Sequence, residues 1–165
     1  MDSTLDFLKR LDEQGARFVV VGGVAGVAHG STLVTEDLDV CAPLTRENLA
    51  KILAALRGLH PCWRMTQNHR PLAENPTELA GYKNLYLTTD LGQIDIISEI
   101  AGVGDFADVV HESITLDLGP VSCRVLDLGA LIRSKRALAR PKDLQAAAEL
   151  EAIRERRICP DTEGE

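Results

Sequence analysis

The sequence is poor in aromatic residues and has an excess of acidic ones. It contains one Trp, two Tyr and three Phe among 165 residues. Trp63, Tyr82 and Tyr86 do not form the stacking series that proteins use to bind single-stranded nucleic acid. The formal net charge is −7, which argues against a broad basic face that coats long nucleic acids. A local basic site remains compatible with this charge.

Long hydrophobic runs are missing as well. No apolar stretch approaches the ~20 residues that span a bilayer, and residues 1–6 carry acid where a secretory signal carries base. We therefore expect a cytoplasmic protein that does not use a membrane. The length and the composition, 45% hydrophobic and 26% charged, predict one domain over 1–165. Its core is expected over about 16–152 and a frayed tail over 160–165.

Cysteine and histidine show none of the spacings of a metal site. The cysteines include no CxxC pair, and we expect free thiols. Cys41 and Cys123 are expected in the core because they lie in apolar runs. The histidines show no metal-ligand spacing either, and His29 is expected to be packed inside the protein. These residues therefore indicate neither a zinc site nor a disulfide framework.

Two adjacent glycines end the first strongly apolar run. Residues 18–21 (Phe-Val-Val-Val) are typical of a buried strand, and Gly22-Gly23 supply the turn that bounds it. A short helix is expected over 24–29, so free backbone N–H groups lie at the two glycines. Such N–H groups, together with the helix dipole, attract phosphate.

Asp37 and Asp39 begin the next short apolar segment. In an extended chain, residues i and i+2 point to the same face, so the two carboxylates are expected side by side. Two like charges so close together are unfavourable unless a cation lies between them. Mg²⁺ bound by carboxylates and substrate phosphates is such a cation. The pair therefore indicates nucleotide chemistry.

A third carboxylate is predicted on a neighbouring strand. Residues 84–88 and 93–97 form a hairpin pattern around a turn at 90–92, and Asp95 stands among isoleucines in its second strand. If this strand lies next to that of Asp37 and Asp39, the three carboxylates converge. The structural alternative for Asp95 is pairing with a buried arginine, and no arginine in the sequence stands out as that partner.

The remaining patterns predict a mixed α/β architecture, with a mixed or antiparallel sheet flanked by helices. Between His60 and Leu79, three prolines and many polar residues predict a mobile loop. Further helices are expected to begin near Ser3, Thr45, Asp127 and Asp143 and to cover 106–111, and a further strand is expected over 121–126.

The order of these motifs resembles a known family. Gly-Gly, a gap, Asp-x-Asp and a later strand Asp are similar to the nucleotidyltransferase superfamily that includes DNA polymerase β. Within it, the chain resembles minimal bacterial nucleotidyltransferases of the abortive-infection toxin type. The segments 20–25, 34–40 and 140–144 carry the resemblance, which covers about residues 16–152. It implies a polymerase-β-like nucleotidyltransferase fold for nearly the whole chain.

The resemblance also implies roles for the residues at the matching positions of the motif. Asp37 and Asp39 would be ligands of two Mg²⁺ ions, with Mn²⁺ as an alternative, and Asp95 would hold the catalytic metal and help to deprotonate the acceptor hydroxyl. Two such ions ~3.5–4 Å apart stabilise the attacking and leaving oxygens. Gly22 and Gly23 would line the triphosphate of an NTP.

Three further residues are candidates to contact phosphate or the acceptor. The resemblance suggests Lys135 and Lys142, which belong to a stretch with five positive charges within ten residues; such a stretch is otherwise a solvated face. Ser31 carries a hydroxyl that either contacts phosphate or completes a turn. Toxin-type relatives often have Arg and Lys where this chain has Leu33 and Val21, so two positive charges near the expected phosphates are missing.

The reaction implied by the resemblance moves NMP from NTP to an acceptor hydroxyl and releases pyrophosphate. The acceptor is an RNA end, including that of a tRNA, a protein or a small molecule, and an antitoxin protein is a candidate partner. The alternative from a different class is a catalytically weak or inactive nucleotide-binding module of the same fold. Leu33 and Val21 favour this module, and the three carboxylates disfavour it. A phosphohydrolase with water as nucleophile is a third alternative.

Overall fold

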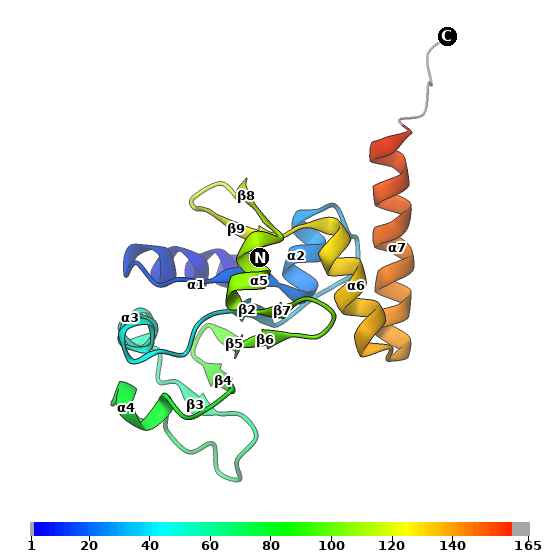
Figure 1. Ribbon diagram of the computed structural model, residues 1–165. Helices are drawn as coiled ribbons and strands as arrows, with labels where there is room; N and C mark the ends of the chain where they lie inside the picture. Colours follow the sequence, from blue (N-terminus) through cyan, green and yellow to red (C-terminus); the bar gives the residue numbers. More distant parts are fainter. Residues whose placement is uncertain (1, 160–165) are drawn as a thin grey trace.

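A mixed β-sheet forms the centre of the molecule, and helices cover both of its sides (Figure 1). The structure is a computed structural model that describes residues 2–159, so the frayed tail predicted over 160–165 lies outside the described residues. The seven strands follow the order β3 (Cys62–Trp63), β4 (Asn84–Thr89), β5 (Gly92–Ile97), β2 (Leu38–Cys41), β1 (Val19–Val21), β9 (Ser122–Leu126) and β8 (Ser113–Asp117). β2 is parallel to β5 and β1 to β9, whereas the other neighbours are antiparallel. The predicted mixed α/β architecture is therefore confirmed.

The helices form a layer on each side of this sheet. They are α1 (Asp2–Glu13), α2 (Gly22–Ala28), α3 (Arg46–Leu56), α4 (Pro76–Leu79), α5 (Phe106–His111), α6 (Leu128–Leu138) and α7 (Pro141–Ile158), and a separate ribbon consists of β6 (Glu99–Ile100) and β7 (Gly104–Asp105). Figure 1 shows α1 and α3 on one side, and α2, α6 and, outside them, α7 on the other. No helix among residues 2–159 is long and apolar enough to cross a membrane.

Capping side chains start two of the predicted helices. The hydroxyl of Thr45 accepts a hydrogen bond from the backbone N–H of Asn48 at 3.2 Å, at the start of α3. The carboxylate of Asp127 accepts one from the N–H of Ala130 at 2.8 Å, at the start of α6. Both bonds satisfy N–H groups that have no partner within the helix, which confirms these two predicted starts.

Two other helix starts differ from the prediction. α7 begins at Pro141 instead of Asp143, because the fixed φ of proline and its missing N–H suit the first turn of a helix. α1 begins at Asp2, so Ser3 lies inside the helix and does not cap it. Leu144, predicted on the apolar side of the last helix, is exposed. Local capping signals therefore located these helices but not their first residues.

The segment predicted as a loop between His60 and Leu79 is partly regular. It contains β3 at the sheet edge and the short helix α4, and it buries Trp63 and Leu72. The strand β8 was not predicted. It is also an edge strand, and its residues are exposed or half-buried. Both omissions concern edge strands, which lack the continuous apolar pattern of strands that are buried on both faces.

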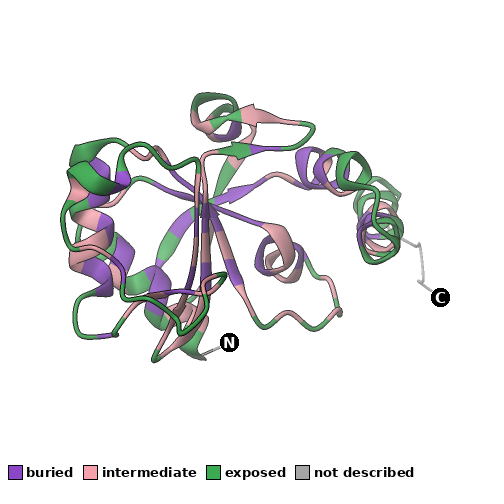
Figure 2. Cartoon of the chain, turned by 90° about the horizontal axis from the view of Figure 1, so that it is seen from below, coloured by how far each residue is buried: buried purple, intermediate pink, exposed green. Residues whose placement is uncertain are grey.

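Alternation along β2 and β5 divides these strands into two faces. Leu38 and Val40 of β2 are buried, as are Ile94 and Ile96 of β5. Figure 2 shows that the buried residues follow the strands and the sides of the helices that face the sheet. Since successive strand residues point to opposite faces, the polar residues between these four side chains share the other face of the sheet.

The cysteines and His29 behave as predicted. All four cysteines are free, and Cys41 and Cys123 are buried. Burial raises the pKa of the Cys41 thiol to about 12 and that of Cys123 to about 11, so neither is a ready nucleophile. His29 is buried, and its Nε2 lies 2.8 Å from the carbonyl oxygen of Leu126.

Candidate functional site

The parallel pairing of β2 with β5 brings the predicted aspartates together. Asp39 is the direct neighbour of Asp95 across the two strands. Two residues before Asp95 on β5, Gln93 donates its side-chain amide to both carboxylate oxygens of Asp37, at 3.0 and 2.9 Å, when the amide nitrogen is turned toward them; Asp37 directly precedes β2. These side chains, Asp37, Asp39, Gln93 and Asp95, share one face and are called the β2–β5 quartet below. Gln93 was not predicted, although its position two residues before Asp95 was a signal for the same face.

Asp39 is the most strongly perturbed member of the quartet. Burial raises its pKa to about 7, and the negative charges of Asp95 and Asp37 add to the shift, whereas the positive charge of Lys135 opposes it. A carboxylate in this state is stabilised by any additional cation. The structure thus concentrates an unfavourable negative charge at the point where a metal was expected.

Gly22 and Gly23 are packed against the segment that carries the aspartates. A Cβ atom on Gly22 would lie 2.3 Å from Oδ2 of Asp39, and one on Gly23 would lie 2.5 Å from Oγ1 of Thr35. Gly22 also has φ +64°, a conformation that glycine adopts without steric cost. Gly22 is therefore required for close packing at Asp39, and Gly23 for close packing at Thr35, whether or not the two also line a phosphate.

Asp95 has an arginine partner, contrary to the sequence-based expectation. Arg64 Nη1 lies 2.7 Å from Oδ1 of Asp95, and the guanidinium lies over the ring of Tyr86, 5.7 Å from its centroid. The ion pair lacks the direction of a hydrogen bond, and Oδ1 is a buried oxygen that receives no hydrogen bond within the described chain. The partner was missed because Arg64 lies in the segment whose pattern predicted only a loop.

Two cavities meet at Asp39. The glycine-side cavity, of about 430 Å³, is lined by the two glycines, Ser31, Asp37 and Lys142 among others. The Asp95-side cavity, of about 480 Å³, is lined by Asp95, Asn84, Tyr86 and Glu99 among others. Both cavities share four lining residues, which are Gly22, Asp39, Lys135 and Arg140. All predicted site residues therefore lie at these two cavities, with Asp37 and Asp95 on opposite sides of Asp39.

The junction of α6 and α7 supplies the positive charge at the shared wall. Asp143 is 1% exposed, and its carboxylate lies 3.6 Å from Lys135 Nζ and 2.5 Å from Arg140 Nε. Burial alone would raise the pKa of Asp143, but the hydrogen bonds and charge of Arg140, together with Lys135, hold this pKa below its ordinary value. Asp143 was not predicted as a site residue, although its spacing of three residues from Arg140 on a helix start indicated the pair.

Ser31 and Lys142 occupy different positions in the glycine-side cavity. The hydroxyl of Ser31 accepts a hydrogen bond from the backbone N–H of Leu33 at 3.2 Å, which is the turn role that the sequence left open. Lys142 is exposed at the start of α7. Of the two predicted lysines, Lys142 is thus the one on the surface of the cavity, and Lys135 is held by Asp143.

The quartet fits a divalent cation by donor chemistry but is not a closed metal site. Among residues 2–159, no three His, Cys, Asp or Glu side chains are grouped closely enough to hold a metal ion. Asp39 and Asp95 offer the oxygen ligands that Mg²⁺ prefers, and Mg²⁺ is commonly held by one or two carboxylates together with substrate phosphates. The buried Oδ1 of Asp95 has the chemistry of such a ligand, although Arg64 Nη1 lies 2.7 Å from it.

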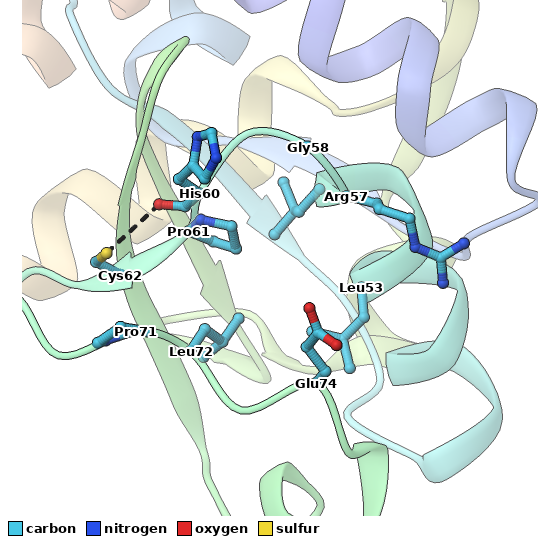
Figure 3. A pocket seen from close by; sticks show the side chains of 10 residues that line it. Leu53, Arg57, Gly58, His60, Pro61, Cys62, Pro71, Leu72 and Glu74 are labelled. Carbon is cyan, nitrogen blue, oxygen red and sulfur yellow. Dashed lines mark hydrogen bonds between the residues drawn. The ribbon is translucent and has the colours of Figure 1, made fainter.

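A third cavity lies away from the quartet. It has a volume of about 490 Å³ and is enclosed by the end of α3 and the segments around Cys62 and Leu72 (Figure 3). His60 Nδ1 lies 2.7 Å from Asp90 at its edge, and the thiol of Cys62 donates to the carbonyl oxygen of His60 at 3.4 Å. Because the thiol contacts a carbonyl and not the imidazole, these residues do not form an activated nucleophile.

Comparison with known proteins adds no relative. No protein-family model matches the chain, and no curated protein matches its sequence. The function must therefore be inferred from the geometry of the quartet and its two cavities.

Proposed function

We propose that the protein is a nucleotidyltransferase of polymerase-β-like fold that uses a divalent metal ion. It would transfer NMP from NTP to an acceptor hydroxyl and release pyrophosphate. The observation that carries the proposal is the position of Asp39, on the wall shared by two cavities and next to Asp95 on the neighbouring strand. A transferase needs two such spaces, one for the nucleotide and one for the acceptor, with the metal ligands between them.

The residues divide between the two sides of Asp39. Asp39 and Asp95, with Asp37, would hold Mg²⁺ or Mn²⁺, which neutralises phosphate charge and orients the reacting groups. The glycine-side cavity would take the triphosphate, with Lys142 at its surface and Lys135 on the shared wall. Positive charge from these lysines favours the polyanionic NTP over the empty cavity.

The acceptor would enter through the Asp95-side cavity. Its hydroxyl oxygen forms a bond to the α-phosphorus while the bond to the pyrophosphate oxygen breaks, and the hydroxyl proton passes to a carboxylate of the quartet. Within the quartet, Asp95 lines this cavity and not the glycine-side one, so we assign this proton to Asp95. An RNA end, a protein hydroxyl and a small molecule remain the candidate acceptors, and an antitoxin protein the candidate partner.

The test is transfer of labelled NMP from each of the four NTPs, with Mg²⁺ or Mn²⁺, to bacterial RNA and protein extracts. Asp39→Asn keeps the shape of the side chain and removes a metal-binding charge. We expect it to lower transfer by about 100-fold, the effect of a lost metal partner. Asp12→Asn, which removes an exposed carboxylate from α1, is the matched control and should retain activity. Equal transfer by wild type and Asp39→Asn would contradict the assignment.

A nucleotide-binding module without turnover is the second candidate. The pairing of Arg64 with Asp95 favours it, because the guanidinium already neutralises the third carboxylate. Leu33, which lines the glycine-side cavity, and Val21 also favour this module, because both are apolar where toxin-type relatives often have a positive charge. NTP binding without release of pyrophosphate would support this module, and release of inorganic phosphate would support a hydrolase.

A further inference from the structure

Arg64 is the last member of a row of side chains that crosses the sheet. Asp39 on β2 is paired with Asp95 on β5, and Asp95 is paired with Tyr86 on β4. Arg64 follows directly after β3, and its backbone N–H donates to the carbonyl oxygen of Tyr86 at 3.0 Å. Residues directly opposite one another on neighbouring strands share a face. The guanidinium therefore reaches Asp95 across the ring of Tyr86.

The ion pair is largely withdrawn from water. The side chain of Arg64 is 21% exposed and that of Asp95 14%. The pKa of Arg64 is raised, first by its interaction with Asp95, and Asp37 and Asp39 contribute in the same direction. Since arginine remains charged in proteins, the positive charge beside Asp95 is permanent.

The contact is close, but it involves a single oxygen of Asp95. The 2.7 Å separation brings opposite charges together, but Oδ1 of Asp95 still receives no directed hydrogen bond. The strongest arginine–carboxylate ion pairs are bidentate, with two parallel N–H···O hydrogen bonds. The observed contact joins one guanidinium nitrogen to one carboxylate oxygen, so it is weaker than a bidentate pair.

We propose that Arg64 is an internal counter-ion that competes with a divalent cation for Asp95. The inference rests on the metal dependence in the proposed function. A guanidinium and a divalent cation repel each other strongly when both lie against one carboxylate in a partly buried site. Arg64 therefore opposes metal binding at Asp95, and the ion pair weakens the affinity of the site for metal.

The opposite role for Arg64 makes the opposite prediction. If Arg64 orients Asp95 toward the metal, its removal must weaken metal binding. If Arg64 competes, its removal must strengthen metal binding. The direction of the change in metal affinity therefore separates the two roles without any measurement of catalysis.

The experiment is titration with Mn²⁺ in the absence of NTP, with free Mn²⁺ measured by electron paramagnetic resonance. Wild type is compared with Arg64→Gln, Arg64→Lys and Arg70→Gln. Arg70 is an exposed arginine of the same segment, so its replacement removes an equal charge at a matched position. We expect Arg64→Gln to bind Mn²⁺ about tenfold more tightly; the size is that of the effect of a changed partner of a metal ligand, but its direction is opposite to the usual loss of affinity. Arg64→Lys, which keeps the charge, and Arg70→Gln should stay near wild type.

A second variant guards against misfolding of Arg64→Gln. Tyr86→Leu removes the ring face that supports the guanidinium, whereas Tyr86→Phe keeps the ring and loses only the hydroxyl that accepts from Asn84 at 3.1 Å. Competition predicts tighter Mn²⁺ binding in Tyr86→Leu than in Tyr86→Phe. Equal affinities in this pair would overturn the proposal.

The outcomes also separate this inference from the proposed function. Tighter Mn²⁺ binding by Arg64→Gln, without NMP transfer by any variant, would support the competition and overturn the transferase alone. Unchanged or weaker binding by Arg64→Gln would overturn the competition, whatever the transfer assay shows. Absence of Mn²⁺ binding by all variants would overturn it as well.

Discussion

Gly22 illustrates how a single residue is determined by its neighbour as well as by its backbone. Its φ of +64° favours glycine, and the carboxylate of Asp39 occupies the space where a Cβ would lie. A glycine after a buried strand was predicted to supply a turn and to line phosphate. The structure adds a packing requirement that no local pattern contains, because Asp39 comes from another strand.

Gly22→Ala should destabilise the protein more than Gly15→Ala does. Gly15 has φ +70°, and no atom lies within 4 Å of the place that a Cβ would take there, so its replacement measures backbone strain alone, about 1 kcal/mol. Gly22→Ala adds the clash with Asp39, an overpacking cost of about 1–3 kcal/mol. Urea unfolding of both variants checks the difference, and equal losses would show that Asp39 moves aside freely.

The raised pKa of Asp39 predicts that the stability of the protein depends on pH. Its pKa is raised from 3.8 to about 7 in the folded protein, first by burial, so the folded state holds this proton more tightly than the unfolded state. The stabilisation is complete below the unfolded pKa and is lost as the pH rises through about 7. Its upper limit is about 1.4 kcal/mol for each unit of the shift.

The measurement is the free energy of unfolding between pH 4 and pH 8, with a chelator to remove divalent ions. Wild type should lose stability relative to Asp39→Asn as the pH rises, since the amide does not ionise. Added Mg²⁺ should reduce this loss if the ionised carboxylate binds the metal. A difference between the two proteins that does not change with pH would contradict the raised pKa.

At the scale of elements, the junction of α6 and α7 is organised by one buried carboxylate. Asp143 accepts from Arg140 and lies near Lys135, so it connects the start of α7 to a side chain of α6. Both helices were predicted, although the predicted cap Asp143 lies inside α7. The burial of Asp143 against Lys135 of the preceding helix and against Arg140 was not predicted, because it depends on how the two helices pack.

Asp143→Asn should destabilise the protein by about 2 kcal/mol, since it leaves Lys135, 16% exposed, without its buried counter-charge, whereas Arg140, 55% exposed, remains hydrated. The pKa of Asp143 is lowered in the folded state, so its contribution is present above the ordinary carboxyl range and is lost as the pH falls. Glu151→Gln is the matched control, because the Arg136–Glu151 pair joins the same two helices with Arg136 exposed. Thermal and urea unfolding should show that this control lowers the free energy of unfolding by less than about 1 kcal/mol. Similar losses in both variants would contradict the role assigned to Asp143.

At the scale of the whole molecule, the order of the strands decides the site. The alternation of β5 and its hairpin with β4 were predictable from local pattern. The sequence argument assumed that the strand of Asp95 lies next to that of Asp39. The structure shows that β5 is parallel to β2 and that Asp95 is paired with Asp39. The edge strand β3 was not predicted, because a strand of two residues is too short to show a hydrophobic periodicity. The position of Arg64, which directly follows β3, was missed for the same reason. The polymerase-β-like fold and the metal site remain predictions.

Sequence patterns were sufficient to predict the mixed α/β composition, the buried central strands, the caps at Thr45 and Asp127, and the placement of Asp39 and Asp95 on strand faces. These features follow from local periodicity and capping, which depend on residues a few positions apart. Three contacts became visible only in the folded protein: Gln93 with Asp37, Arg64 with Asp95, and Asp39 with both cavities. Such contacts join distant parts of the chain, and their formation depends on strand order and helix packing, which no local pattern specifies.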